Sequence, residues 1–203
     1  AMMSRRRLLG GAAVALMWPV QRSRAAPTLN EVVYDPALPV LGNQAGDVTI
    51  AEFFDYLCPS CKALHPRLKE IVRSDGAIRL VMKDWPINGD IAWYASRMVH
   101  ASAALGFYPA AHDAVMALDG ALTHGRVDDA LRSVGADAGA VRDRLDQHLE
   151  AIEALIARNR AHAEAFALAG TPAFLIGKRL YRRALDADEI VAAVALARKD
   201  QAG

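Results

Sequence analysis

The sequence predicts an α/β fold, in which the core of strands and helices is interrupted by an all-helical insertion. Two short runs rich in β-branched and aromatic residues, at 48–56 and 78–83, enclose a segment with helical spacing. An alanine-rich region with helical spacing follows, and strand signals then return before a last helix. This order of elements is typical of an α/β core that carries an insertion.

Residues 48–56 are predicted to form the central strand. The run is short, β-branched and aromatic, and it is apolar on both faces, as a strand in the middle of a sheet should be. Alternation puts Glu52 on the same face as Ile50 and Phe54. A carboxyl group aimed into an apolar layer is unusual and needs a reason. The alternative is an edge strand on which Glu52 reaches solvent.

A helix is predicted to begin at Pro59, because a proline suits the first turn, and Pro66 should kink it. A break at Gly76 precedes the second strand. Five side chains at helical spacing supply the buried stripe of this helix: Cys61, Leu64, Leu68, Ile71 and Val72.

The helical block extends from about residue 91 to 169, where glycines divide it into four or five predicted helices. The last of these is expected to be long and to cover residues 150–169. A short strand at 173–176, a turn and a second strand at 179–183 follow, and Asp186 is placed to cap a final helix.

One domain is therefore predicted over residues 26–203, with the insertion over about 90–169. Residues 1–25 are interpreted as an export signal peptide, because three arginines precede a short apolar run and a small-x-small site ends at Ala25. The apolar run is too short to cross a bilayer. Its arginines also fit a twin-arginine signal, and the choice between this route and general secretion stays open. The expected location is the periplasm, and the mature protein is not expected to span the membrane.

The charge pattern excludes a nucleic-acid-binding protein. The whole chain has 24 basic and 23 acidic residues, but the first 25 residues hold five arginines and no acid. Removing these five leaves 19 basic residues against 23 acidic ones, so the mature part is acidic and offers no clustered basic face.

The two cysteines of the chain, Cys58 and Cys61, lie three positions apart where the central strand meets its helix. A disulfide that closes so small a loop constrains the unfolded chain little, which makes a purely structural role a weak explanation. At the first helical turn, free N–H groups and the helix dipole should lower the pKa of Cys58. Cys61, one turn further in, should be the buried resolving thiol.

Two metal or cofactor roles compete with a redox role. Cys58, Cys61 and His65 lie on successive turns and could supply three zinc ligands, although no second cluster completes a structural site. Haem attachment requires a histidine directly after the second cysteine, and this position holds Lys62. Five other histidines are scattered through the helical block and are expected to be solvated or packed: His100, His112, His124, His148 and His162. Residues 85–87 follow the second strand and are expected either at the active-site surface or in the core.

Residues 52–61, Glu-Phe-Phe-Asp-Tyr-Leu-Cys-Pro-Ser-Cys, resemble the active-site segment of the DsbA family of exported disulfide oxidoreductases. Thr171-Pro172-Ala173-Phe174 resembles the second element of that family, a loop with a cis-proline opposite the dithiol. The resemblance extends from Asp35 to the last helix. It implies a thioredoxin-like fold, with a central mixed sheet flanked by helices and an inserted all-helical subdomain.

The resemblance also implies roles for individual residues. Cys58 matches the exposed nucleophile and Cys61 its buried partner. Pro172 matches the cis-proline, and Thr171 the residue whose backbone contacts substrate. Glu52 matches a buried acid, whose raised pKa would let it relay the proton that Cys61 exchanges.

The dipeptide between the cysteines, Pro59-Ser60, departs from the Pro-His of strongly oxidising members. Ser60 brings no positive charge, so the direction of net flux stays open. The leading hypothesis is a dithiol oxidase that acts on reduced or unfolded secreted proteins, is reoxidised by a membrane partner, and needs no cofactor besides the Cys58–Cys61 disulfide. A reductase or isomerase that uses the same site, and a thiol-based metal-binding protein, are the alternatives.

Overall fold

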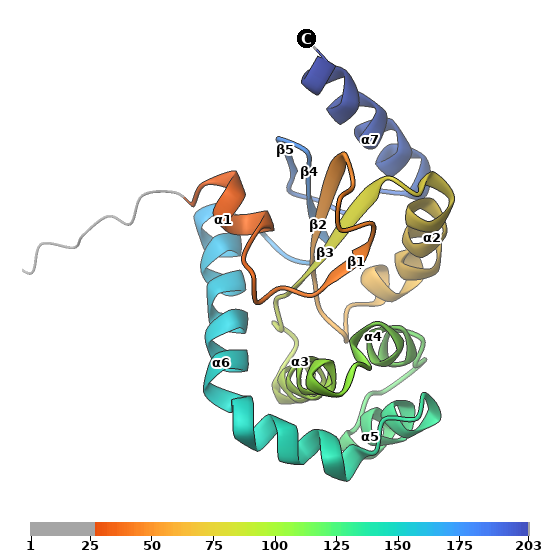
Figure 1. Cartoon of the computed structure of the whole chain (residues 1–203), viewed down its shortest axis with the longest axis vertical. Coiled ribbons are helices and arrows are strands. Elements are labelled where there is room, and N and C mark those ends of the chain that lie inside the picture. The colour runs from red at the N-terminus through yellow and green to blue at the C-terminus, as the bar shows by residue number, and fades with distance from the viewer. Residues whose placement is uncertain (1–26, 203) are drawn as a thin grey trace, which may run out of the picture.

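The computed structural model describes residues 27–202, so the predicted export signal lies outside the described residues. A five-stranded mixed sheet forms the centre of the molecule (Figure 1). Its order is β1-β3-β2-β4-β5; β2 and β3 are parallel, and the other neighbours are antiparallel. The strands are β1 (Val40–Gly42), β2 (Val48–Phe54), β3 (Ile78–Asp84), β4 (Ala173–Ile176) and β5 (Arg179–Tyr181).

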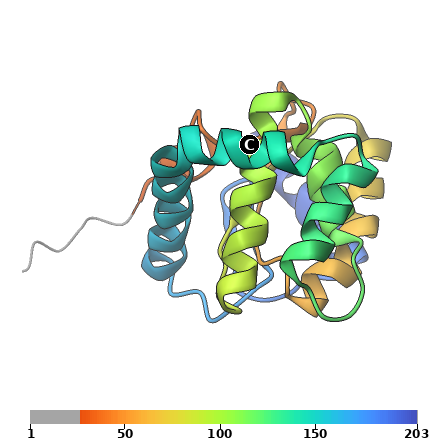
Figure 2. The ribbon, with the colours of Figure 1, turned by 90° about the horizontal axis from the view of Figure 1, so that it is seen from below.

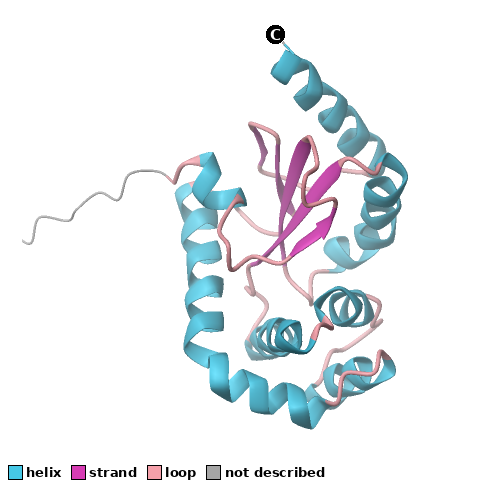
Figure 3. Ribbon diagram, viewed as in Figure 1, coloured by secondary structure: helices cyan, strands magenta, loops and turns pink. Residues whose placement is uncertain are grey.

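Helices cover both faces of this sheet. Figure 3 shows α2 and α7 on one side of the strands and α1 with the later part of α6 on the other. The helices are α1 (Leu29–Val33), α2 (Pro59–Asp75), α3 (Asp90–Ser102), α4 (Tyr108–Met116), α5 (His124–Ser133), α6 (Ala138–Ala165) and α7 (Ala187–Ala202), with a 3₁₀ turn η1 (Ala103–Leu105) after α3. The predicted thioredoxin-like fold is confirmed.

The alternation of β2 explains this two-sided packing. Every residue of β2 is buried. Ile50 and Phe54 join the core that includes Leu68 of α2, whereas Phe53 joins the core on the α1 and α6 side with Val32. Burial on both faces identifies β2 as the central strand, as its composition predicts.

The strand ends slightly earlier than predicted. Asp55 leaves the sheet, and its carbonyl accepts the N–H of Cys58 at 3.0 Å, which closes a turn before α2. Tyr56 and Leu57 therefore belong to this turn rather than to the strand. The turn places Cys58 directly before the first residue of α2.

The helices α3 to α6 lie between β3 and β4 in the chain. Helices α3, α4 and α5 and the first part of α6 pack below the sheet, as Figure 2 shows from that side. The prediction that the long helix begins at residue 150 is wrong, because α6 begins at Ala138. The side chain of Asp137 caps it by accepting the N–H of Ala140 at 2.8 Å. Few side chains are buried in the first half of α6, so apolar spacing gives little signal there.

The last helix is fixed at both ends. Asp186 and Glu189 exchange side-chain and backbone hydrogen bonds before its first turn, which confirms Asp186 as the cap. Near the other end, Arg198 donates to the carboxylates of Asp47 and Asp75, and so joins α7 to the start of β2 and the end of α2. Within residues 27–202, no helix has the length and apolar character needed to cross a membrane.

Candidate active site

Cys58 is the N-cap residue of α2. Its backbone is extended, and its sulfur accepts the N–H of Cys61 at 3.3 Å. The first helical turn therefore turns a free donor toward the sulfur, where it favours negative charge. Both cysteines carry free thiols in this structure. Cys61 is buried as expected, but Cys58 is buried as well, so the exposed position that the resemblance implies for Cys58 is not found.

The pKa values of the two thiols are shifted in opposite directions. A hydrogen bond from Cys61 is the main cause that lowers the pKa of Cys58, to about 6, and the backbone N–H groups of Cys61 and Ser60 add to it. The same bond to Cys58 raises the pKa of Cys61, and burial raises it further. When one proton is lost from the pair, Cys58 is the residue that becomes the thiolate, which is the reactive form.

The loop before β4 lies against Cys58 although it is more than a hundred residues away in the chain. The Cys58 thiol donates to the carbonyl of Thr171 at 3.3 Å. The peptide bond between Thr171 and Pro172 is cis. The antiparallel pairing of β2 with β4 carries this loop to the end of β2, where α2 begins.

Glu52 lies in the sheet behind the dithiol. It pairs with Met82 of β3 and Phe174 of β4, so it occupies a central strand, and the alternative of an edge carboxyl that reaches solvent is excluded. The residue is 1% exposed, and neither carboxyl oxygen has a hydrogen-bond partner among the described residues. Burial, and secondarily the charge of Cys58, raise the pKa of Glu52 to about 8. A carboxyl in this position keeps a proton at neutral pH.

Asp55 is a site residue that the sequence analysis missed. It is 1% exposed, and one carboxylate oxygen accepts the N–H of Leu57 at 2.6 Å. The other oxygen accepts the N–H groups of Ile87 and Asn88, at 2.7 and 2.9 Å. The available signal was an aspartate directly after a buried strand, since an Asp side chain often accepts the backbone N–H two residues further on and so forms a turn.

The histidines of the helical block are less scattered than the sequence suggested. His112 is fully buried, and its Nδ1 lies 2.8 Å from the hydroxyl of Tyr56, two residues before Cys58. His100 is bonded to Asp84 at the end of β3. Burial lowers the pKa of His112 to about 3, so its ring is neutral. These histidines are packed groups that join the helical insertion to the sheet.

The proposed zinc set does not form a cluster. His65 is buried on α2, but its Nε2 pairs with Asp113 of α4 at 2.9 Å. Among the described residues there is no group of three or more histidine, cysteine and acidic side chains that could hold a metal ion. The geometry thus gives the metal-binding alternative no support.

A groove with a volume of about 770 Å³ lies beside the dithiol, between the start of α2 and the segment after α4. Leu57 and Pro59, the neighbours of Cys58, line one side, and Met116 and Leu122 line the other. Pro172 is not among its lining residues. The apolar part of this groove therefore lies on the α4 side of the dithiol and not at Pro172.

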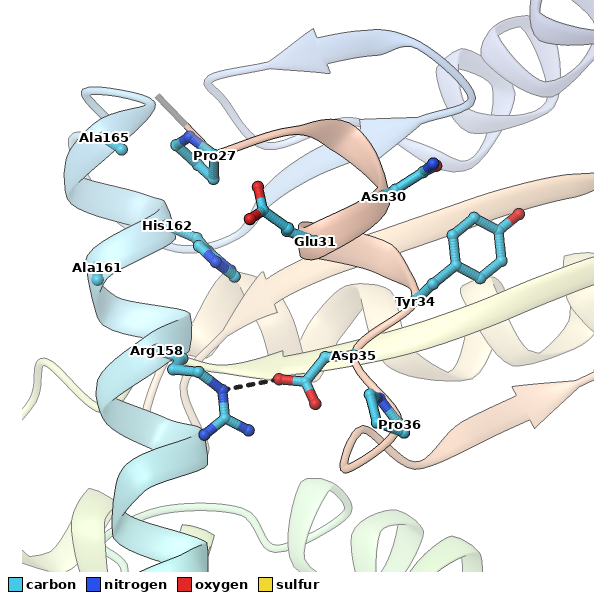
Figure 4. Close-up of a pocket in the computed structure, with 10 residues that line it drawn as sticks. All are labelled: Pro27, Asn30, Glu31, Tyr34, Asp35, Pro36, Arg158, Ala161, His162 and Ala165. Carbon is cyan, nitrogen blue, oxygen red and sulfur yellow. Dashed lines mark hydrogen bonds and ion pairs between the residues drawn. The ribbon is translucent and has the colours of Figure 1, made fainter. Parts of the chain in front are cut away.

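A second cavity, of about 680 Å³, lies away from the dithiol between α1 and α6 (Figure 4). Its charged side chains are bonded within the protein. Arg158 pairs with Asp35 at 2.8 Å, and Glu31 accepts from Thr28. His162 lies 3.1 Å from the buried Nζ of Lys83. With these groups engaged, the cavity offers no free reactive pair and is not a candidate active site.

A cysteine pair at the start of a helix, placed directly after a central strand and facing a loop before an antiparallel strand, defines a thioredoxin-like thiol–disulfide oxidoreductase. Comparison with known proteins agrees. Residues 35–195 match the family model described as Thioredoxin, so the chain belongs to this family.

Two solved structures show which members of the thioredoxin family the chain is similar to. A thioredoxin-like oxidoreductase from Silicibacter pomeroyi DSS-3 is 34% identical, with a TM-score of 0.81 and coverage of 85% of this chain and 99% of that chain. The thiol-disulfide exchange protein alpha-DsbA2 from Wolbachia pipientis is 26% identical, with a TM-score of 0.77 and coverage of 82% and 90%. The chain is a DsbA-like member of the thiol:disulfide oxidoreductases.

The chain is also similar to part of a longer protein. It is 26% identical over 186 residues to the Na⁺/H⁺ antiporter NhaA 1 of Salinispora arenicola. This match covers 87% of the chain but 28% of the antiporter, and a second antiporter is matched over 29% of its length. The chain thus spans less than a third of the length of these curated relatives.

Proposed function

We propose that this chain is an exported, periplasmic dithiol oxidase that introduces disulfides into reduced client proteins. The acidity of Cys58 at the start of α2, next to a buried Cys61 whose pKa is raised, is the observation that carries the proposal. A thiolate that is stabilised in the reduced enzyme makes the disulfide form a stronger oxidant. The arginine-rich and apolar residues 1–25 support export.

The reaction begins with the oxidised Cys58–Cys61 disulfide. A client thiolate attacks the sulfur of Cys58, the bond between the cysteines breaks, and Cys61 leaves with the electron pair. The carboxyl of Glu52 gives Cys61 a proton, which its raised pKa allows it to hold until that moment. The product of this step is a mixed disulfide between the client and Cys58.

A second client thiolate then attacks the client sulfur of the mixed disulfide. The client disulfide forms, and Cys58 leaves as a thiolate, a form that its low pKa stabilises. Two electrons have passed from the client to the enzyme. A membrane reoxidase, which the DsbA resemblance implies, would remove them and restore the disulfide.

Client binding is proposed to use the loop before β4. Thr171 is half-buried beside Cys58, and a client strand can pair with its backbone while the client cysteine reaches the sulfur. Pro172 shapes this loop, and the groove beside Leu57 and Pro59 accommodates apolar client side chains.

The test is the equilibrium of the Cys58–Cys61 pair with glutathione redox buffers. A reduction potential well above that of thioredoxin, about −270 mV, supports an oxidase. Cys58→Ser should abolish oxidation of a reduced client. Cys61→Ser, the matched control, should still react through Cys58 and accumulate a mixed disulfide with a client that carries an activated disulfide. A Cys58→Ser variant that still oxidises the client would overturn the proposal.

One observation favours a second candidate, a reductase or isomerase that uses the same site. Ser60 contributes its backbone N–H to Cys58 but no positive charge, so the thiolate has less support than a histidine at this position would provide. A potential near or below that of thioredoxin, together with reactivation of a scrambled disulfide protein, would favour this candidate.

A further inference from the structure

The Asp55 carboxylate joins two segments of chain that leave the same edge of the sheet. β2 and β3 are parallel, with Phe54 opposite Asp84, so the turn before Cys58 and the segment after β3 begin side by side. The N–H of Trp85 donates to the carbonyl of Phe54 at 2.9 Å and extends this pairing by one bond. Beyond it, the connection between the two segments is made by Asp55.

The bonds of Asp55 require a carboxylate. The side chain accepts three backbone N–H groups and is almost fully buried. An ionised carboxylate offers acceptors on both oxygens, whereas the asparagine amide offers one oxygen and one donor group. Asparagine at this position can therefore keep the turn bond to Leu57 or the bonds to Ile87 and Asn88, but not both sets.

The segment held by Asp55 presents an apolar side chain to solvent. Trp85 is buried, but Ile87 is 46% exposed. The other large apolar side chains that are exposed within residues 27–202 lie on or directly after α1, on α6 or on α7. Ile87 is thus the exposed apolar residue at the end of the sheet where Cys58 is found.

We propose that Asp55 is a positioning residue that holds residues 85–89 beside the dithiol, and that Ile87 is the apolar rim that contacts the client segment flanking the reacting cysteine. This inference rests on the proposed function and deepens it, because it names the clients that the site prefers: polypeptides with apolar residues next to the cysteine.

The experiment compares two reduced dithiol peptides that differ only in the residues next to the attacking cysteine, leucine in one and glycine in the other. The readout is the ratio of their kcat/KM values with the oxidised enzyme. The wild type should prefer the leucine peptide. Asp55→Asn and Ile87→Ser should each lower this preference about threefold or more, as expected from the loss of part of one apolar contact, and the double variant should lower it no further.

Val191→Ser is the matched control, since Val191 is a similarly exposed apolar residue on α7, and it should keep the wild-type preference. General damage to the fold would slow both peptides and leave their ratio unchanged, so an unchanged ratio in Asp55→Asn or Ile87→Ser overturns the inference. A double variant whose loss of preference equals the product of the two single losses would also overturn the inference. If Asp55→Asn does not fold, hydrogen exchange of the wild type replaces it. Rapid exchange at the Ile87 and Asn88 amides would overturn the inference, and slow exchange would support it.

The proposed function and this inference fail in different ways. A wild type that oxidises neither peptide would overturn the proposed function. A wild type that oxidises both peptides equally well would overturn this inference alone.

Discussion

The buried Glu52 carboxyl should make the stability of the protein depend on pH in a defined window. Its pKa is about 8 in the folded protein because of burial, against an ordinary value of 4.5. Between these pH values the unfolded chain has lost the proton while the folded protein keeps it. The folded state then binds more protons, so its stability falls as the pH rises from 4.5 to 8.

Glu52→Gln removes this titration while preserving the shape of the side chain. The difference in free energy of unfolding between the variant and the wild type should therefore grow in favour of glutamine by about 1.4 kcal/mol per pH unit. The growth amounts to about 3 kcal/mol from pH 4.5 to 7 and to about 4 kcal/mol by pH 8, because the slope levels off near each of the two pKa values. Titrations that are common to both proteins cancel in this difference.

Urea unfolding of the reduced proteins at pH 4.5, 6, 7 and 8 measures the effect. Glu150→Gln, at an exposed position on α6, is the control and should show no comparable rise. A difference between Glu52→Gln and wild type that stays flat across this range would refute the reasoning. It would mean that the Glu52 carboxyl is ionised in the folded protein, and the proton-donor role proposed for it would fail with it.

Three further predictions concern the Cys58 thiol and two side-chain contacts that join the elements of the fold. Alkylation of the reduced protein should label Cys58 with a rate that rises around pH 6 and should spare Cys61, as mass spectrometry of the labelled peptides can check; a midpoint near 9 would contradict the low pKa. Arg198→Ala should lower the free energy of unfolding by about 1 kcal/mol, because its carboxylate contacts are partly exposed, and the loss seen in urea unfolding should shrink at high salt. Tyr56→Phe should cost about 1–3 kcal/mol, because it leaves the buried His112 without its partner; an unchanged unfolding midpoint would argue against that bond.

The central elements could be predicted because local and tertiary signals agree in them. β2 is apolar on both faces, and it is buried on both faces because it lies between β3 and β4. α2 begins at Pro59 as expected and continues through Pro66 to Asp75. The spacing of the two cysteines at this junction was sufficient to locate the candidate site.

The missed features depend on contacts that a linear pattern does not contain. The first half of α6 is mostly solvated, so its start was marked by the cap at Asp137 rather than by apolar spacing. His112 and Tyr56 are 56 positions apart and meet because α4 packs against the end of the sheet. Asp55 fell within the predicted strand 48–56, and its bonds to Ile87 and Asn88 exist because β2 and β3 are parallel neighbours.

The acidity of Cys58 in this chain comes from short-range hydrogen bonds. The groups that lower its pKa include the Cys61 thiol and the backbone N–H groups of Cys61 and Ser60. Lys62, the cation next in sequence, instead donates to the carbonyls of Val115 and Leu118 at the end of α4. Dipoles and hydrogen bonds in a buried site are screened by salt far less than exposed ion pairs. The low pKa of Cys58 thus comes from hydrogen bonds at the start of α2 and from the Cys61 thiol, and it needs no positive charge at Ser60.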